Sequence, residues 1–257
     1  MATLLVTGGT GTLGRAVVGR LLDDGHDVRS LSRRLPAGPP TPGLHPYAVD
    51  LRDGTGLEEA VAGVDTVVHC ASTPSGGDEE AAGHLLDAAR AAGVKHLVYI
   101  SIVGVGGIPL GYYRTKRAVE RMVEHSGVGW TILRTTQFHD LLLRVVKTGA
   151  RSPLLPYPTG LRFQPIEVRE VAARMAGLAL GAPVGRVPDM GGPQVLDVRD
   201  LIRLTLRYGG RRRLTVPLWL PGRTMAGFRA GENLAPGHAV GKRTYEEFLK
   251  ERAGWRE

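Results

Sequence analysis

The sequence predicts an α/β protein with a doubly wound parallel sheet and a small, mostly helical region at its C-terminal end. Three observations lead to this fold class. Short apolar runs alternate with helix-like segments over the first half of the chain, and the runs are apolar throughout, as in strands that are covered on both faces. A glycine-rich turn joins the first run to the first helix. At 257 residues, 42% of them hydrophobic, the chain can bury a sizeable core.

The predicted elements follow one another in strand–helix order. Strands are expected at Thr3–Thr7, Val28–Leu31, Tyr47–Val49 (a weak one), Thr66–Cys70, His96–Ser101 and Trp130–Leu133. Helices are expected at Leu13–Asp24, Leu57–Ala62, Glu79–Ala92 and about Tyr112–Ser126. Glycines directly after two of these helices, Gly25 and Gly93, agree with the predicted helix ends.

The alternation weakens after about residue 135. Residues 149–165 are rich in proline and glycine and are expected to form an excursion without regular structure. Helical stretches return near Glu167–Leu180, Val198–Tyr208 and Thr244–Arg252. We therefore expect a first domain over residues 1–150 and a cap region over residues 151–257 that packs on it, the two forming one compact unit.

The net charge of +8 is a local feature of the chain. The segment Arg199–Arg229 holds eight arginines and a single acid, Asp200, which leaves a charge of only +1 for all other residues. Arg199, Arg203 and Arg207 are spaced as one solvated face of a helix, which is the simplest interpretation. An anion-binding patch or a contact with an acidic partner is the alternative. No nucleic-acid-binding signature accompanies the charge, and no nucleic-acid partner is expected.

The composition excludes several classes of protein. No apolar run approaches the roughly 18 residues of a transmembrane helix, and Leu4–Val6 is far too short for the core of a signal peptide. The single cysteine, Cys70, cannot form an internal disulfide, and the eight histidines show no metal-ligand spacing. We expect a soluble, cytoplasmic protein without a membrane partner or a bound metal.

The strongest motif is the turn Thr7–Gly14, with the sequence TGGTGTLG. It satisfies Gly-x-Gly-x-x-Gly between a strand and a helix, the context that indicates dinucleotide binding. Glycines let the backbone approach a pyrophosphate, which is held by free N–H groups at the helix N-terminus. A tight turn without a ligand is the alternative. The expected cofactor-binding residues here are Thr7, Gly8, Gly9, Thr10, Gly11, Thr12, Leu13 and Gly14, and residues 1–150 are predicted to form a Rossmann-type domain.

The end of the second strand favours NADP(H) over NAD(H). A carboxylate there would bind the ribose 2′-hydroxyl of NAD, but Asp27 lies at the opposite end of this strand. The strand instead runs into Arg33 and Arg34, which suit a 2′-phosphate, with Arg33 the nearer partner. Exposed loop arginines without a ligand are the alternative.

Several segments together resemble the short-chain dehydrogenase/reductase superfamily, and in particular its atypical, NmrA-like NAD(P)H-binding branch. The resemblance spans nearly the whole chain and is much more specific for fold and cofactor than for the reaction. It rests on Thr7–Gly14, Asp50-Leu51, His69–Ser72, Val98–Ser101, Tyr112–Glu120, Thr131–Phe138, Gly191–Pro193 and Thr244–Leu249.

The resemblance implies roles for individual residues. Asp50 and Leu51 would lie beside the adenine, Cys70, Ala71 and Ser72 would line the cofactor at the sheet edge, and Thr135 and Thr136 would lie near the nicotinamide. Tyr112 and Lys116 match the Tyr-x-x-x-Lys pair of the superfamily. Residues four apart share a helix face, so the ammonium can hold the cofactor ribose and lower the pKa of the phenol. The tyrosine would then exchange a proton with the substrate while hydride moves to or from the nicotinamide.

One departure from the superfamily pattern concerns the catalytic serine or threonine. The chain has Val103 at that position, so Ser101 is the nearest remaining hydroxyl, and Tyr113 is a second candidate phenol. His139 either lines the substrate pocket or packs in the ordinary way. We expect an NADP(H)-dependent oxidoreductase with a small carbonyl, enone or quinone-like substrate. The alternative is a non-catalytic NADP(H)-binding regulator of the NmrA type, and both a monomer and a homodimer stay open.

Overall fold

The computed structural model describes residues 2–35, 39–73 and 76–252, which divide into two compact units. The sheet unit contains Met1–Ser101, Gly111–Arg134 and Arg169–Pro188, and the second unit contains Ile102–Leu110, Thr135–Val168 and Asp189–Glu257. Each unit takes three separate segments of the chain. The division predicted from the sequence, residues 1–150 and 151–257, stays a prediction.

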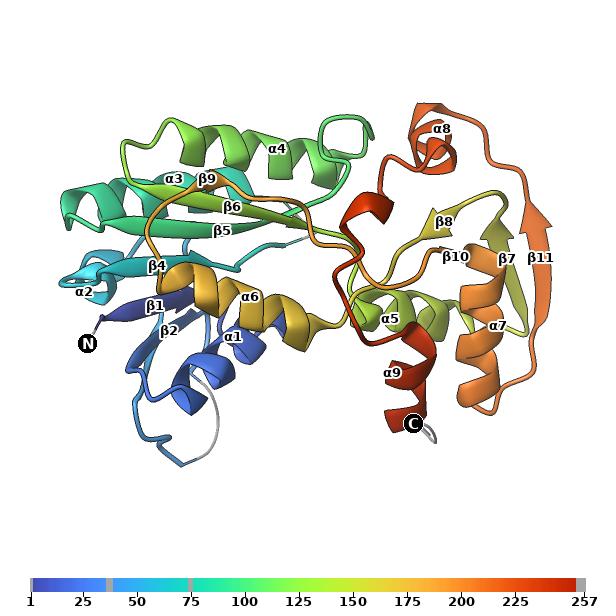
Figure 1. Cartoon of the computed structure of the whole chain (residues 1–257), viewed down its shortest axis with the longest axis horizontal. Helices are drawn as coiled ribbons and strands as arrows, with labels where there is room; N and C mark the ends of the chain where they lie inside the picture. The colour runs from blue at the N-terminus through green and yellow to red at the C-terminus, as the bar shows by residue number, and fades with distance from the viewer. Residues whose placement is uncertain (1, 36–38, 74–75, 253–257) are drawn as a thin grey trace. The chain divides into compact units, whose positions relative to one another are not determined.

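A seven-stranded parallel sheet forms the centre of the sheet unit, as predicted (Figure 1). Its order is β3-β2-β1-β4-β5-β6-β9, so the direction of strand addition reverses between β1 and β4. This reversal is the switch point at which such sheets bind ligands. The strands are β1 (Leu4–Thr7), β2 (Val28–Ser32), β3 (Leu44–Ala48), β4 (Thr66–His69), β5 (His96–Ile102), β6 (Trp130–Thr135) and β9 (Gly185–Arg186).

Helices cover both faces of the sheet. One face carries α1 (Thr12–Asp23) and α6 (Val168–Ala179), and the other carries α2 (Leu57–Val61), α3 (Asp78–Ala91) and α4 (Gly111–Glu124) (Figure 1). This double cover explains why β1 and β4 are buried at every position, and why the residues inside these strands are apolar apart from threonine and histidine at their ends. Across the described ranges, no helix is both long and apolar enough to cross a membrane.

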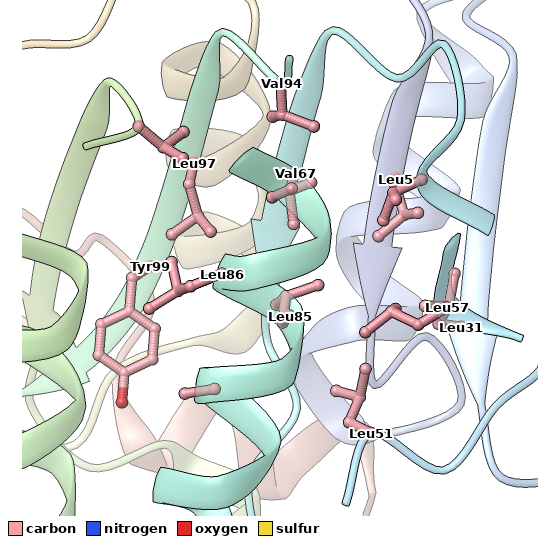
Figure 2. Close-up of a cluster of buried hydrophobic side chains, with 14 of the residues drawn as sticks. Leu5, Leu31, Leu51, Leu57, Val67, Leu85, Leu86, Val94, Leu97 and Tyr99 are labelled. Carbon is pink, nitrogen blue, oxygen red and sulfur yellow. The ribbon is translucent and has the colours of Figure 1, made fainter. Parts of the chain in front are cut away.

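The main core lies between the sheet and the helices α2 to α4. Leu85 and Leu86 project from α3 toward Val67, Leu97 and neighbouring strand residues (Figure 2). Each fully buried leucine stabilises the fold by about 1.5–3 kcal/mol relative to an exposed one. The core thus fixes α3 and α4 on the sheet, and these two helices carry several of the polar residues described below.

The second unit combines helices with two small sheets. Its helices are α5 (His139–Gly149), α7 (Val198–Tyr208), α8 (Arg223–Ala230) and α9 (Tyr245–Glu251), and its strands are β7 (Leu154–Pro158), β8 (Arg162–Phe163), β10 (Leu196–Asp197) and β11 (Leu214–Leu218). The prediction that residues 149–165 lack regular structure is wrong, because β7 pairs with β11 and β8 with β10. Two prolines are tolerated in β7 because a strand of a two-stranded sheet has one unpaired edge.

Helix α7 explains part of the basic segment. Its buried side is formed by Leu201, Ile202, Thr205 and Leu206. Arg199, Arg203 and Arg207 are all exposed, as expected for one solvated helix face. The arginines thus occupy the side of the helix that is not needed for packing.

His139 is part of the packing of the second unit. Its ring contacts those of Tyr245 and Phe248, with centroids 5.6 and 5.0 Å away, and its Nε2 lies 3.1 Å from the carbonyl oxygen of Arg243. Burial lowers the pKa of this imidazole to about 4. These contacts favour the packing interpretation over a role in a substrate pocket.

Candidate active site

The turn after β1 can be built only with glycine at two of its positions. Gly8 has a φ of +66°, and a Cβ there would lie 2.8 Å from the Cα of Ala71. A Cβ on Gly14 would lie 2.2 Å from the carbonyl oxygen of Gly8. The glycines therefore allow the turn to pack against both the start of α1 and the loop after β4.

The start of α1 provides donors for an anion. Its N-cap is Gly11, which supplies no side-chain hydrogen bond, and its first turn contains no acidic residue. The first N–H groups of any helix lack partners within the helix, and the helix dipole adds partial positive charge there. This end of α1 therefore fits the pyrophosphate of a dinucleotide.

A cleft opens at the carboxyl ends of β1 and β4, at the switch point of the sheet. Nine of the residues predicted to bind the cofactor line it: Gly8, Thr10, Gly11, Arg33, Asp50, Leu51, Cys70, Ala71 and Ser72. Arg52, Thr73, Gly77 and Asp78 also line it and were not predicted from the sequence. All of these residues belong to the sheet unit, so one compact unit forms the cleft.

Other predicted residues support the turn or the helix start instead of lining the cleft. Thr7 Oγ1 accepts a hydrogen bond from the N–H of Ala71 at 3.1 Å and lies 2.8 Å from Nδ1 of His69. Thr12 begins α1, and Leu13 is buried in its first turn. Thr7 thus ties the glycine turn to the loop after β4.

His69 and Cys70 are electrically neutral at the floor of the cleft. Burial, with a smaller effect of the charge on Lys116, lowers the pKa of His69 to about 3. Burial also raises the pKa of the Cys70 thiol to about 12. Neither group is therefore suited to acid–base or nucleophilic chemistry near neutral pH. Among the residues that the structure describes, no cluster of histidine, cysteine or acidic side chains could hold a metal ion.

Two arginines bring positive charge to the cleft beyond β2 and β3. Arg33 follows β2 and is exposed, whereas Arg52 forms an ion pair with Asp50 at 3.2 Å. The hydrogen bonds from Arg52 lower the pKa of the Asp50 carboxyl, and Arg33 adds a smaller effect in the same direction. Arg34 is exposed and lies outside the cleft lining, in contrast to its neighbour.

Tyr112 and Lys116 lie one turn apart on α4. Lys116 is 3% exposed, and its ammonium donates a hydrogen bond to the carbonyl oxygen of Ile100 at 3.2 Å and lies 5.9 Å from the ring centre of Tyr112. Burial lowers the pKa of Lys116 to about 8, against the opposing effect of Asp78. Burial also raises the pKa of the Tyr112 phenol. At neutral pH the pair is therefore a charged ammonium beside a protonated phenol.

The hydroxyl of Tyr112 lies 3.4 Å from Oγ of Ser72, a residue of the cleft. Ser72 in turn donates a hydrogen bond to Oδ2 of Asp78 at 2.6 Å. A chain of three polar groups thus connects α3, the loop after β4 and α4. The sequence suggested a cofactor contact for Ser72, but it gave no sign of the contact with Tyr112.

Ser101 is buried, and its hydroxyl oxygen has no hydrogen-bond partner among the described residues. On α4, the Glu120 carboxylate receives two hydrogen bonds from Arg134 of β6, at 2.6 and 2.7 Å. Glu120 lies two helical turns, about 12 Å, beyond Tyr112. This ion pair fixes α4 on the sheet, and the catalytic role expected for Ser101 stays a prediction.

The remaining candidates differ in their surroundings. Tyr113 is 3% exposed and meets the ring of Tyr112 edge-on, so its phenol is the less accessible of the two. Thr135 and Val103 belong to the second unit, where the N–H of Val103 donates to the carbonyl oxygen of Thr135 at 2.9 Å. The contact of Thr135 with the cofactor stays a prediction.

Comparison with known proteins identifies the family. The model of a family described as NAD(P)H-binding matches residues 8–153, more than half of the chain. The chain belongs to this NAD(P)H-binding family. The match confirms the NAD(P)H binding that the resemblance implied, and it begins at Gly8 in the glycine turn.

Named relatives of this NAD(P)H-binding protein include reductases. A (4-alkanoyl-5-oxo-2,5-dihydrofuran-3-yl)methyl phosphate reductase of Streptomyces griseus is 33% identical over 219 residues, 81% of this chain and 74% of the relative. An NAD(P)H azoreductase of Xenophilus azovorans is 29% identical, over 90% of this chain and 83% of the relative. An NADPH-dependent quinone oxidoreductase of Escherichia coli, solved with NADPH, has a TM-score of 0.80 at 19% identity and covers 97% of this chain and 99% of its own. The chain is thus a member of an NAD(P)H-binding oxidoreductase family with an α/β fold of the Rossmann type.

Proposed function

We propose that the protein is an NADPH-dependent reductase of a small conjugated carbonyl compound, such as an enone or a quinone. The observation that carries this proposal is the placement of Tyr112 and Lys116 on one face of α4, with the Tyr112 hydroxyl beside the cleft residue Ser72. A protonated phenol next to a buried ammonium is the arrangement needed to donate a proton to a substrate oxygen.

The choice of NADPH is supported by the charge of the cleft. Arg33 and Arg52 contribute two guanidinium groups near the ends of β2 and β3, and Asp50 is already paired with Arg52. A guanidinium binds phosphate oxygens through several N–H groups at once. Because its carboxylate is paired, Asp50 is not available to bind a ribose 2′-hydroxyl, whereas Arg33 suits a 2′-phosphate.

These positions assign separate roles to the cofactor, Tyr112 and Lys116. The cofactor, when bound, supplies a hydride. Tyr112 gives its phenolic proton to the substrate oxygen, and the charge of Lys116 stabilises the phenolate that remains. Lys116 is held at Ile100 and lies under the Tyr112 ring, so it is already in place before the substrate binds. Its pKa of about 8 keeps it mostly charged at neutral pH.

The substrate class is suggested by the chemistry of the relatives. The names of three of them specify an oxo-dihydrofuran bearing an alkanoyl group, an azo compound and a quinone. All three are unsaturated electrophiles that take up a hydride and a proton. Such a substrate requires a proton donor and a hydride donor but no metal.

The test is a panel of enones, quinones, aldehydes and ketones, with NADPH or NADH consumption followed at 340 nm. We expect turnover of at least one conjugated substrate, with a higher kcat/KM for NADPH than for NADH. A protein that binds NADPH but oxidises it with no member of the panel would contradict the proposal. That result would favour the regulatory alternative, which predicts a cofactor-dependent association with a partner protein.

A further inference from the structure

A directed chain of hydrogen-bonding groups ends at the Tyr112 hydroxyl. Ser72 lies 2.6 Å from Oδ2 of Asp78 and 3.4 Å from the phenolic oxygen of Tyr112. A serine hydroxyl has one hydrogen and two lone pairs. Because the short contact to a carboxylate takes that hydrogen, Ser72 presents its lone pairs to Tyr112, whose own hydrogen can point toward it.

The far end of this chain is fixed. Asp78 is the first residue of α3 and is only 7% exposed. Its second oxygen, Oδ1, accepts the N–H of Thr73 at 2.8 Å, and a carboxylate is favoured at a helix N-terminus. Both oxygens are thus engaged in the loop that joins β4 to α3. The Asp78 carboxylate is therefore held in one orientation.

We propose that Ser72 and Asp78 are positioning residues for Tyr112, with Ser72 as the hydroxyl partner that the superfamily pattern would place at Val103. This inference rests on the proposed function of Tyr112 as proton donor. Val103 has no hydroxyl, whereas the Ser72 hydroxyl lies within 3.4 Å of the phenolic oxygen of Tyr112. The contact between Ser72 and Tyr112 joins the cleft lining to the proton donor, which a purely structural serine would not need to do.

The groups that face Tyr112 and Lys116 come from several elements. Asp78 acts on Tyr112 from α3, and Lys116 lies on the same helix as Tyr112. The ring centre of Tyr99, on β5, lies 4.8 Å from the ammonium nitrogen of Lys116. Cys70 and Glu120 also act on Lys116. All five groups belong to the sheet unit.

Ser72 and Asp78 act on the Tyr112 phenol in opposite directions. The hydrogen bond of Ser72 lowers the pKa of Tyr112, because Ser72 can turn its hydrogen to the phenolate, whereas the negative charge of Asp78 raises this pKa. Asp78 also raises the pKa of Lys116. Removing the two side chains one at a time should therefore move the ionisation of Tyr112 in opposite directions.

The first experiment measures these ionisations without a substrate. Protein labelled with [13Cζ]tyrosine is titrated by NMR, and Tyr112→Phe assigns the signal among seven tyrosines. We expect Ser72→Ala to ionise at higher pH than the wild type and Asp78→Asn at lower pH. Glu79→Gln removes an exposed carboxylate from the same helix turn and should leave the titration unchanged. Shifts of the same sign, or none, would overturn the proposal even if the protein proved to be a reductase.

The second experiment uses a substrate found in the panel above. We expect Ser72→Ala to lower kcat about 10- to 100-fold, and Ser72→Thr, which restores the hydroxyl, to recover most of the loss. Asp78→Asn should move the alkaline fall of kcat to lower pH, because Tyr112 and Lys116 then both lose their protons more readily. Wild-type kcat in Ser72→Ala would contradict the inference. A wild-type protein that turns over nothing would contradict the proposed function instead, and the NMR titration would still decide the roles of Ser72 and Asp78.

Discussion

Replacing Arg33 with alanine is expected to weaken NADPH binding about ten- to hundredfold and to leave NADH binding unchanged. The side chain lines the cleft just beyond the end of β2, where the two cofactors differ by one phosphate. A hydrogen bond between charged groups contributes about 1.5–3 kcal/mol, and each 1.4 kcal/mol is a tenfold change in Kd. The expected loss should shrink as salt is added, because the guanidinium is exposed.

The neighbouring residues provide the controls for this experiment. Arg34→Ala removes the same charge one residue later, outside the cleft lining, and should change the NADPH Kd less than threefold. Arg52→Ala removes a cleft arginine and also releases the Asp50 carboxylate, so it should weaken NADPH binding more than NADH binding. Isothermal titration of both cofactors at fixed ionic strength compares all variants. Equal effects of Arg33→Ala and Arg34→Ala, or equal losses for NADPH and NADH, would refute the reasoning.

Three further predictions concern stability and the basic segment. Glu120→Ala should lower the free energy of unfolding in urea by about 3–5 kcal/mol, because it removes the fully buried carboxylate of the ion pair with Arg134, whereas Glu124→Ala on the same helix should cost at most about 1 kcal/mol. Gly14→Ala should destabilise the fold by about 1–3 kcal/mol and weaken cofactor binding, whereas Gly19→Ala, in open space on α1, should be neutral or stabilising in the same unfolding assay. Residues 199–229 should bind duplex DNA weakly, with an affinity that collapses between low and physiological salt in an anisotropy titration, and tight sequence-selective binding would contradict the solvated-face interpretation.

The sheet was predictable because the features that indicate its strands lie within short stretches of the sequence. Strands that are covered on both faces are mostly apolar, and the glycine turn marks the first strand and helix without any knowledge of their partners. The second unit was harder to predict. Strand β7 contains two prolines and gains its pairing only from β11, some sixty residues later, so nothing near it in the sequence indicates a strand.

The candidate site likewise contains residues that were predictable from the sequence and residues that were not. The glycine turn, Arg33 and the pair of Tyr112 and Lys116 follow from spacing along single elements, and the structure brings most of the predicted cofactor residues to one cleft. Arg52 and Asp78 were missed because their roles depend on contacts between separate loops. The contact between Ser72 and Tyr112 joins residues forty positions apart, which a single sequence does not reveal.

The central claim is that the Tyr112 hydroxyl donates the proton in an NADPH-dependent reduction. The most direct measurement is the single-turnover rate of NADPH oxidation in Tyr112→Phe and in Tyr113→Phe, with the NADPH Kd of each variant measured alongside. We predict that Tyr112→Phe keeps its NADPH affinity but loses about 10²–10⁴-fold in rate, the usual contribution of a positioned proton donor, while Tyr113→Phe stays near the wild type. A wild-type rate in Tyr112→Phe, or a large loss only in Tyr113→Phe, would contradict this assignment.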